Sequence, residues 1–343
     1  MKKSALIRKM SHLFLRLFAR IISVLRLDHR NLTSLSSSEI EIFARFLANL
    51  IKTFRVEKGD FSYFDMFKYW EKNGFHIIPD HFYQPIPHLQ DLSPKIWEKK
   101  SRLVSIDMNE KRQLHFLRKV FPLFKREYNQ FPHQPTVNEY DFHFGNGAFD
   151  GIDALVLYCM IRYFKPKKII EVGSGWSTRI AAKAALKNGN SKLTSIEPYP
   201  YDFLKKGFPG LTKQIPKQIQ EVDLNFFKNL GENDILFIDS SHTVKIGGDV
   251  NYLFLEVLPR LKKEVIIHIH DIFLPYEYPK NWVTKEYRFW NEQYLLHAFL
   301  INNNHFEILF ANNYMGDKYK KAMKQTFPNS PFHRGGSIWL KKI

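Results

Sequence analysis

The sequence predicts an α/β fold in which a mostly parallel sheet carries helices on both faces. Short apolar runs alternate with helical segments from position 150 onward, which is the pattern of a doubly wound sheet. The stretch KKIIEVGSGWS at 167–177 has the pattern of a buried strand, a glycine turn and the start of a helix. Two further apolar runs near position 343 indicate a final strand pair. These observations predict a Rossmann-like domain over 150–343.

Seven strands follow from these runs. The expected strands are Ile169 to Val172, Leu193 to Ile196, Gln218 to Val222, Ile235 to Ile238, Val265 to Ile269, His305 to Phe310 and Gly336 to Lys341. The expected helices of this domain cover 150–164, 178–188, 201–208, 224–230, 244–261 and 287–301.

The residues before position 150 are predicted to form two further regions. Residues 1–30 carry eight Lys or Arg against one acid, and polar side chains recur at helical spacing between Leu6 and Leu27. This pattern predicts a basic amphipathic helix, which either lies at an anionic membrane surface or docks on the protein. Arginines interrupt every apolar run well before the roughly 18 residues that span a bilayer. Residues 31–149 alternate helical and Pro-rich stretches and are expected to form an accessory region of helices and loops, either a lid or a substrate region.

Composition restricts the class of protein. Hydrophobic residues make up 44% and charged residues 25%, which is ordinary for a globular chain. The single cysteine, Cys159, excludes a disulfide scaffold and suits the reducing cytoplasm. The net charge of +17 favours an anionic neighbour. Outside the N-terminal helix the basic residues are scattered and form no RNA-binding signature, so nucleic acid is not the expected partner.

Polar side chains stand at the end of each of the first five strands. In an open parallel sheet, ligands bind at the carboxyl ends of the strands. The series consists of Glu171 with Gly173, Ser174 and Gly175, then Glu197, then Asp223, then Asp239 with His242, and finally His270 with Asp271. One acidic strand end could simply cap a helix, whereas five in order predict a binding site.

This order of strand ends resembles the class I S-adenosylmethionine-dependent methyltransferases, over about Asp150 to Ile343. The resemblance implies a seven-stranded sheet with an antiparallel last pair, and S-adenosylmethionine as the cofactor. It assigns cofactor binding to Glu171, Gly173, Ser174, Gly175, Ser177, Glu197, Asp223 and Asp239. Ser177 stands where the third glycine of the first motif is usual. NAD-binding proteins share the glycine turn and the acid that binds ribose, but their pyrophosphate requires G-x-G-x-x-G. This chain has G-S-G-W-S-T-R there, which favours S-adenosylmethionine over NAD.

The fourth and fifth strand ends resemble more narrowly a bacterial subgroup with cephalosporin-hydroxylase-like and sugar O-methyltransferase members. Some members hold Mg²⁺ at these positions, which implies Asp239 and Asp271 as ligands, with His270 where an acid often stands. Because imidazole suits Zn, Fe, Ni or Cu better than Mg²⁺, both a divalent metal and a metal-free site remain open. The catalytic candidates are His242, His270 and Asp271, of which a histidine could take the acceptor's proton. Each histidine could instead be structural.

The resulting hypothesis is a cytoplasmic O-methyltransferase that acts on a small-molecule or glycan hydroxyl. If the N-terminal helix binds lipid, the protein is expected to be peripheral on the inner face of the membrane. The loop from Phe273 to Trp282, with Tyr276 and Tyr278, is expected to form a wall of the acceptor site. Two alternatives stay open: a nucleic-acid methyltransferase, and a non-catalytic, membrane-peripheral module that binds S-adenosylmethionine.

Overall fold

The computed structural model describes residues 36–53, 64–78, 80–331 and 334–343. The chain divides into two compact units, Met1–Pro79 and Asp80–Ile343. In the first unit the described helices are α3 (Ser37–Thr53) and α4 (Phe64–Lys72). The amphipathic helix predicted between Leu6 and Leu27 lies outside the described residues.

The second unit is built on a seven-stranded sheet in the order β3-β2-β1-β4-β5-β7-β6. Its strands are β1 (Lys168–Val172), β2 (Lys192–Ile196), β3 (Leu211–Ile215), β4 (Ile235–Ile238), β5 (Ile266–His270), β6 (Phe306–Ala311) and β7 (Ser337–Lys342). Strands β1 to β5 pair in parallel, and β7 runs antiparallel to both β5 and β6. The predicted sheet, including its antiparallel last pair, is therefore confirmed.

The predicted third strand was wrong. Residues 218–222 form a 3₁₀ turn, η5 (Ile219–Glu221), whose Ile219 and neighbouring Val222 are buried. The third strand is β3, seven residues earlier, at the edge of the sheet with its central residues exposed. A half-exposed edge strand needs no continuous apolar run, so the polar sequence LTKQI gave no strand signal.

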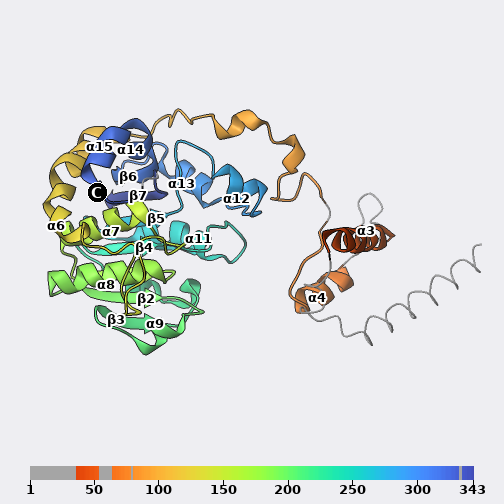
Figure 1. Cartoon of the computed structure of the whole chain (residues 1–343), viewed down its shortest axis with the longest axis horizontal. Helices are drawn as coiled ribbons and strands as arrows, with labels where there is room; N and C mark the ends of the chain where they lie inside the picture. Colours follow the sequence, from red (N-terminus) through yellow and green to blue (C-terminus); the bar gives the residue numbers. More distant parts are fainter. Residues whose placement is uncertain (1–35, 54–63, 79, 332–333) are drawn as a thin grey trace, which may run out of the picture. The chain divides into compact units, whose positions relative to one another are not determined.

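Helices cover both faces of the sheet (Figure 1). Alternate strand residues enter two separate hydrophobic cores: Ile169, Phe237 and Ile266 pack in one, and Ile170, Leu236 and Ile267 in the other. This follows from the period of two along a strand. The helices longer than three residues in this unit are η2 (Pro94–Trp97), α5 (Glu110–His115), η3 (Phe116–Val120), η4 (Phe121–Phe124), α6 (Lys125–Tyr128), α7 (Gly151–Phe164), α8 (Trp176–Asn188), α9 (Asp202–Lys206), α10 (Leu224–Lys228), η6 (Tyr252–Val257), α12 (Lys280–Thr284), α13 (Glu292–Leu300), α14 (Asn312–Lys318) and α15 (Lys320–Thr326).

Helix α7 is the buried centre of the first core. It is buried continuously from Gly151 to Ile161, as expected for a helix that is apolar on all sides. Asp150 begins it by accepting a hydrogen bond from the Gly151 N–H, and Lys165 ends it in the left-handed conformation.

Residues 80–149 belong to the same compact unit as the sheet. Phe116, Phe121, Phe131 and Phe142 pack in the core that contains α7. The two compact units thus divide at position 79, and the three predicted regions, 1–30, 31–149 and 150–343, stay a prediction.

The same region covers the free edge of strand β6. Gln113 is fully buried; its side chain accepts a hydrogen bond from the Ala311 N–H at 2.8 Å and donates one to the Met108 carbonyl at 2.5 Å. The Asn302 N–H donates to the Ser105 carbonyl nearby. We call residues 100–113 the edge strap, because they bond to the end of β6 and to the turn before it.

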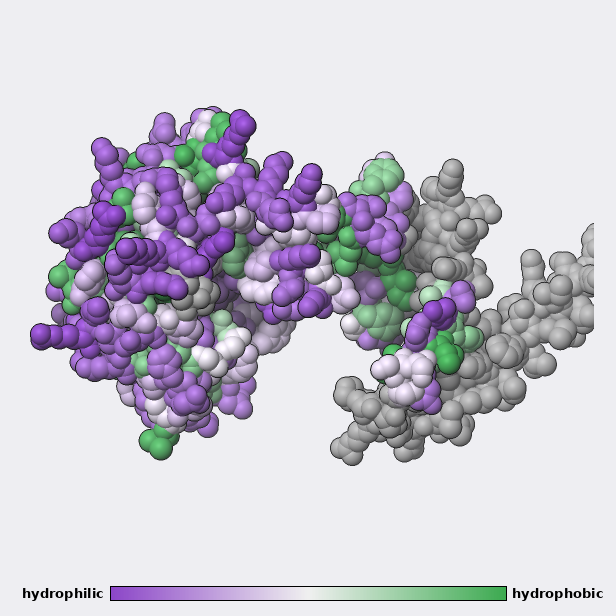
Figure 2. Space-filling view, turned by 45° about the horizontal axis from the view of Figure 1, so that its top comes forward, coloured by the Kyte–Doolittle hydropathy of each residue, from purple (hydrophilic) through white to green (hydrophobic). Residues whose placement is uncertain are grey.

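The visible face of the second unit is mostly hydrophilic, with apolar side chains scattered singly (Figure 2). Across the described ranges, no helix combines the length and the apolar character needed to cross a bilayer.

Candidate active site

Two adjoining cavities lie at the carboxyl ends of the strands, where the strand order reverses between β1 and β4. The first, of about 490 Å³, is lined by residues after β1, β2 and β4 and by Gln218 to Gln220. The second, of about 690 Å³, continues past Ser174 to Ser177 toward His270 and Asp271. Both are lined by Gly173, Glu197 and Asp239. This is the position at which an open parallel sheet binds its ligand.

The glycine turn after β1 brings the backbone close to the end of β4. Gly173 has a φ of +77°, and a Cβ built on it would lie 1.8 Å from the Asp239 carbonyl oxygen. Only glycine fits there. Gly175 differs, because its φ of 175° is extended and a Cβ would meet only the Tyr201 ring at 3.9 Å. Ser174 bonds the hydroxyl of Ser195 on the adjacent strand at 2.5 Å.

Glu171, also predicted to bind the cofactor, lies beneath the turn and lines neither cavity. Its side chain is 1% exposed, and neither carboxylate oxygen has a hydrogen-bond partner within the described residues. Burial raises the pKa of Glu171 to about 8, which Ser177 and Thr178 oppose only in part. At neutral pH the carboxyl group is therefore mostly protonated.

Of the two acids predicted at the second and third strand ends, one lines the cavities and the other does not. Glu197 lines both cavities, and one of its oxygens accepts a hydrogen bond from the Tyr199 N–H at 2.9 Å. Asp223 lines neither cavity; it caps α10 by accepting from the Asn225 N–H at 2.7 Å. The first cavity is instead lined at this point by Gln218 to Gln220, because the chain forms a turn there and not the predicted strand.

Two carboxylates and two imidazoles meet where β4 and β5 end. Asp239 Oδ1 lies 3.4 Å from His270 Nδ1 and 3.2 Å from His242 Nε2. Asp271 Oδ2 lies 3.5 Å and 3.4 Å from the same two nitrogens. Asp239, His270 and Asp271 can each offer one ligand atom, all within 4.8 Å of one another. We call these four residues the strand-end cluster.

The electrostatics of the cluster follow from its burial and its paired charges. Burial would lower the pKa of His270, but Asp271 and Asp239 raise it to about 10. Burial would raise the pKa of Asp239, but His270 and His242 hold it well below its usual value. Burial dominates at Asp271 and raises the pKa of that carboxyl group. Asp271 also has a φ of +55°, a strained backbone geometry that concentrates at functional sites.

His242 stands behind the two carboxylates and lines neither cavity. Its Nδ1 is 2.9 Å from Oε2 of Glu292, a fully buried residue at the start of α13. Burial would lower the pKa of His242, but Asp239 and Glu292 raise it well above its usual value. His242, predicted as a catalytic residue, therefore has its Nε2 within 3.2 and 3.4 Å of the two cluster carboxylates and outside the lining of both cavities.

Glu292 and Asp153 were not predicted from the sequence. Asp153, on α7, is 5% exposed and accepts hydrogen bonds from the Gly336 N–H, the Ser337 hydroxyl and the Asn312 amide. Its Oδ2 lies 3.9 Å from His270 Nε2. Both acids sit in helices far from the strand ends along the chain. An acid inside the apolar stretch GIDALVLYCM was the available signal for Asp153.

The far wall of the second cavity comes from the segment after β5. Trp282, Glu286 and Arg288 line it, and the Arg288 guanidinium lies 4.8 Å from the Trp282 ring centre and bonds Glu286 at 2.8 Å. Tyr276 and Tyr278, predicted for this wall, do not line it. The Tyr276 hydroxyl donates to Asp317, and the buried Tyr278 hydroxyl accepts from the Gln293 N–H.

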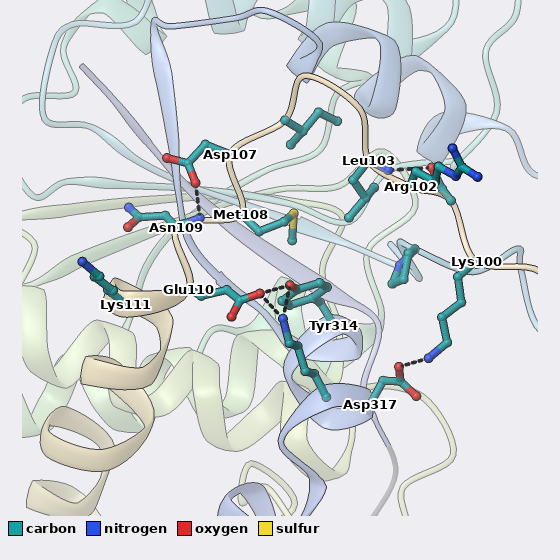
Figure 3. Close-up of a pocket in the computed structure, with 14 residues that line it drawn as sticks. Lys100, Arg102, Leu103, Asp107, Met108, Asn109, Glu110, Lys111, Tyr314 and Asp317 are labelled. Atoms are coloured by element: carbon teal, nitrogen blue, oxygen red, sulfur yellow. Dashed lines mark hydrogen bonds and ion pairs between the residues drawn. The ribbon is translucent and has the colours of Figure 1, made fainter.

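A third and larger cavity, of about 900 Å³, lies between the edge strap and α14 (Figure 3). It contains none of the predicted site residues. Two of its acids are paired: Lys100 pairs with Asp317 at 2.6 Å, and Lys318, Tyr314 and Tyr319 bond Glu110. These three groups lower the pKa of Glu110 to about 2. We therefore place the active site at the strand ends.

Comparison with known proteins agrees with this location. The sequence profile of a methyltransferase domain family matches residues 170–272. An uncharacterised protein of Archaeoglobus fulgidus is 35% identical over 170 residues, which cover 46% of this chain and 75% of that protein.

Solved structures of similar fold include two methyltransferases. One is the O-methyltransferase TomG from Streptomyces achromogenes, in complex with SAM, with a TM-score of 0.36 and 11% identity over 71% of this chain and 91% of that chain. The other is the plantazolicin methyltransferase BpumL, in complex with SAH, with a TM-score of 0.34 and 13% identity over 55% of this chain and 82% of that chain.

Proposed function

Because the chain belongs to the class I S-adenosylmethionine-dependent methyltransferases, we propose that it transfers the methyl group to a hydroxyl oxygen at the strand-end cluster. The observation that carries the proposal is that the two cavities share Gly173, Glu197 and Asp239. A cofactor spanning both cavities would place its adenosine near Glu197 and Gln220. Its sulfonium would then lie between the glycine turn and the cluster.

The chemistry is a direct displacement. The acceptor oxygen attacks the methyl carbon, the sulfur–methyl bond breaks, and the products are a methyl ether and S-adenosylhomocysteine. The hydroxyl proton passes to a carboxylate oxygen of Asp271, which lines the second cavity and whose pKa is raised by burial, whereas the lowered pKa of Asp239 makes that carboxylate a weak base. Most of the rate effect in such a reaction comes from orientation of the two reactants.

A metal ion fits the same residues. Asp239, Asp271 and His270 offer three converging ligand atoms, and a divalent ion held by them would polarise the hydroxyl and lower its pKa. His242 and Glu292 would then keep the two carboxylates in place from behind.

The charges around the second cavity favour a small-molecule or glycan hydroxyl over nucleic acid. Among the described residues that line it, four are acids, Glu197, Asp239, Asp271 and Glu286, and two are basic, Arg288 and His270. Phosphate groups brought against four acids would be repelled. The loop that carries Trp282 also offers an aromatic face to an uncharged ring.

Titration calorimetry tests the proposal. We expect S-adenosylmethionine and S-adenosylhomocysteine to bind, NAD not to bind, and Glu197→Gln to weaken binding by about tenfold through the lost ribose contacts. A screen of pooled sugars and metabolites for methyl transfer would then identify the acceptor. Preferential binding of NAD would reject the proposal, and intact turnover in Asp239→Asn and Asp271→Asn variants would reject the role of the cluster.

A further inference from the structure

We propose that Asp239, Asp271 and His270 form a metal centre in which His270 binds through Nδ1, and that this imidazole selects a transition-metal ion over Mg²⁺. Asp153 acts as the positioning residue that orients the imidazole. The inference deepens the proposed function by naming the ion at the same site, but its test needs neither cofactor nor acceptor.

The spacing of the cluster fits ligands around a common ion. Charge-assisted hydrogen bonds between imidazole and carboxylate are about 2.7–2.9 Å long, as between His242 and Glu292 at 2.9 Å. The distances from His270 Nδ1 to the two cluster carboxylates, 3.4 and 3.5 Å, are longer. Metal–ligand bonds of roughly 2.0–2.2 Å place neighbouring ligand atoms about 3.0–3.5 Å apart. The two separations from Nδ1 therefore suit neighbouring metal ligands better than hydrogen bonds, and all three ligand atoms lie within 4.8 Å of one another.

His270 Nδ1 is also a polar atom without a hydrogen bond, although the carboxylates of Asp239 and Asp271 face it at 3.4 and 3.5 Å. It is buried, and no hydrogen bond to it is formed within the described part of the chain. Such a group costs free energy unless something binds it. The residue is 8% exposed, and the second cavity reaches it. An ion entering from that cavity would satisfy the nitrogen and both facing carboxylate oxygens together.

The surroundings of the ring fix which nitrogen faces the cluster. Nε2 is directed toward Asp153 Oδ2 at 3.9 Å, and the ring packs on Phe149 with 4.8 Å between centres. Asp153 is itself held by Gly336, Ser337 and Asn312. A carboxylate behind a ligating histidine is the usual outer-shell arrangement of protein metal sites. At 3.9 Å the Asp153 carboxylate acts by its charge and not by a hydrogen bond; that charge favours the proton on Nε2, which leaves the Nδ1 lone pair for the ion.

The donor set decides the class of ion. Mg²⁺ prefers oxygen ligands and water, whereas an imidazole together with two carboxylates suits Mn²⁺, Fe²⁺, Co²⁺ or Zn²⁺. Two carboxylates also balance the charge of a divalent ion. The choice of ion depends on His270, because an acid at this position would complete an all-oxygen site of the kind that Mg²⁺ prefers.

The test measures metal binding to chelator-treated full-length protein by calorimetry and by visible absorption of Co²⁺. We expect Co²⁺ and Zn²⁺ to bind at least about 100-fold more tightly than Mg²⁺. His270→Asp should remove this preference and make Mg²⁺ binding tighter than in the wild type. Asp153→Asn should weaken Co²⁺ binding by about 10–100-fold. The control is His305→Ala, which removes an exposed histidine outside the cluster and should change nothing.

Circular dichroism identifies any variant that fails to fold. If His270→Asp fails to fold, His270→Asn replaces it as the variant that lacks the imidazole. Equal affinity for Co²⁺ and Mg²⁺, no binding of either ion, or Co²⁺ binding unchanged in His270→Asp would overturn the inference. In those cases S-adenosylmethionine binding would remain and the proposed function would stand. Metal binding without any S-adenosylmethionine binding would instead reject the proposed function alone.

Discussion

The two glycines of the turn after β1 have different structural requirements. Gly173→Ala would force a methyl group against the Asp239 carbonyl oxygen, in a left-handed backbone conformation. We expect it to lower the free energy of unfolding by about 2–4 kcal/mol and to remove cofactor binding. Gly175→Ala is the matched control, since it meets only the Tyr201 ring and should leave stability within about 1 kcal/mol. Urea unfolding measures both, and equal effects would contradict this account of the turn.

The buried acid below the turn makes stability depend on pH. The pKa of Glu171 is raised to about 8, against about 4.3 in an unfolded chain. Between these values the folded state binds the extra proton, so its stability falls as the pH rises, and above about pH 8 the loss is complete. Glutamine mimics the protonated acid.

Glu171→Gln should therefore be closest to the wild type near pH 4 and be more stable near pH 9, by on the order of 5 kcal/mol, which corresponds to the difference between the folded and unfolded pKa. Urea unfolding of both proteins at the two pH values checks this prediction. A difference in stability that is the same at both pH values would show that Glu171 does not titrate on folding.

At the residue scale, the sequence indicated those candidate site residues that stand next to a predicted strand end. Gly173, Glu197, Asp239, His270 and Asp271 stand directly after strands, and parallel strand ends must converge. Glu292 and Asp153 reach the cluster from helices, and only packing shows that contact. The position of His242 behind the carboxylates also depends on α13, because Glu292 anchors its ring.

At the element scale, the edge strap stabilises the open side of the sheet. An exposed edge strand presents unpaired backbone groups, and Gln113 bonds the Ala311 N–H at the end of β6. Gln113→Ala should leave that buried donor without a partner and cost about 2–3 kcal/mol. Lys111→Ala, an exposed position two residues away, should cost less than about 0.5 kcal/mol. Thermal and urea unfolding of the pair would test the strap, and equal losses would exclude this role for Gln113.

The strongest strand signals in the sequence came from strands that are buried on both faces. Strands β1, β4 and β5 carry continuous apolar runs because helices cover both of their sides. The misplaced third strand lies at the edge, where polar residues are tolerated. The helix predicted over 244–261 begins later, at α11 (Asp249–Asn251), and continues without a break through η6 (Tyr252–Val257) and η7 (Leu258–Arg260). Pro259 near its end removes a backbone donor.

At the scale of the whole molecule, every residue of the proposed active site lies in the unit Asp80–Ile343. A protein beginning at Asp80 should bind S-adenosylmethionine within about twofold of the full chain, because no lining residue is removed. Calorimetry on both forms checks this, with circular dichroism as the control for folding. A large loss of affinity in a folded truncated protein would mean that the first unit contributes to the site.

The N-terminal charge can be tested separately. The excess of Lys and Arg before Asn31 is our reason to propose binding to an anionic membrane surface, since such clusters are attracted to acidic lipids. Full-length protein should sediment with phosphatidylserine vesicles at low salt and be released by high salt, while a form lacking residues 1–30 should stay in the supernatant. Equal sedimentation of both forms would favour a helix that docks on the protein.

The contact between the Gly173 backbone and Asp239 has a thermodynamic consequence. These two residues line both cavities, and Asp239 also belongs to the strand-end cluster. A ligand that fixes the turn therefore also fixes one carboxylate of the cluster. Linkage makes such coupling reciprocal: the factor by which the cofactor changes the affinity of the cluster for its own ligand equals the factor in the opposite direction. The total free energy of forming the ternary complex is then the same whichever ligand binds first. The order of binding decides only whether the turn is fixed by the first ligand or by the second.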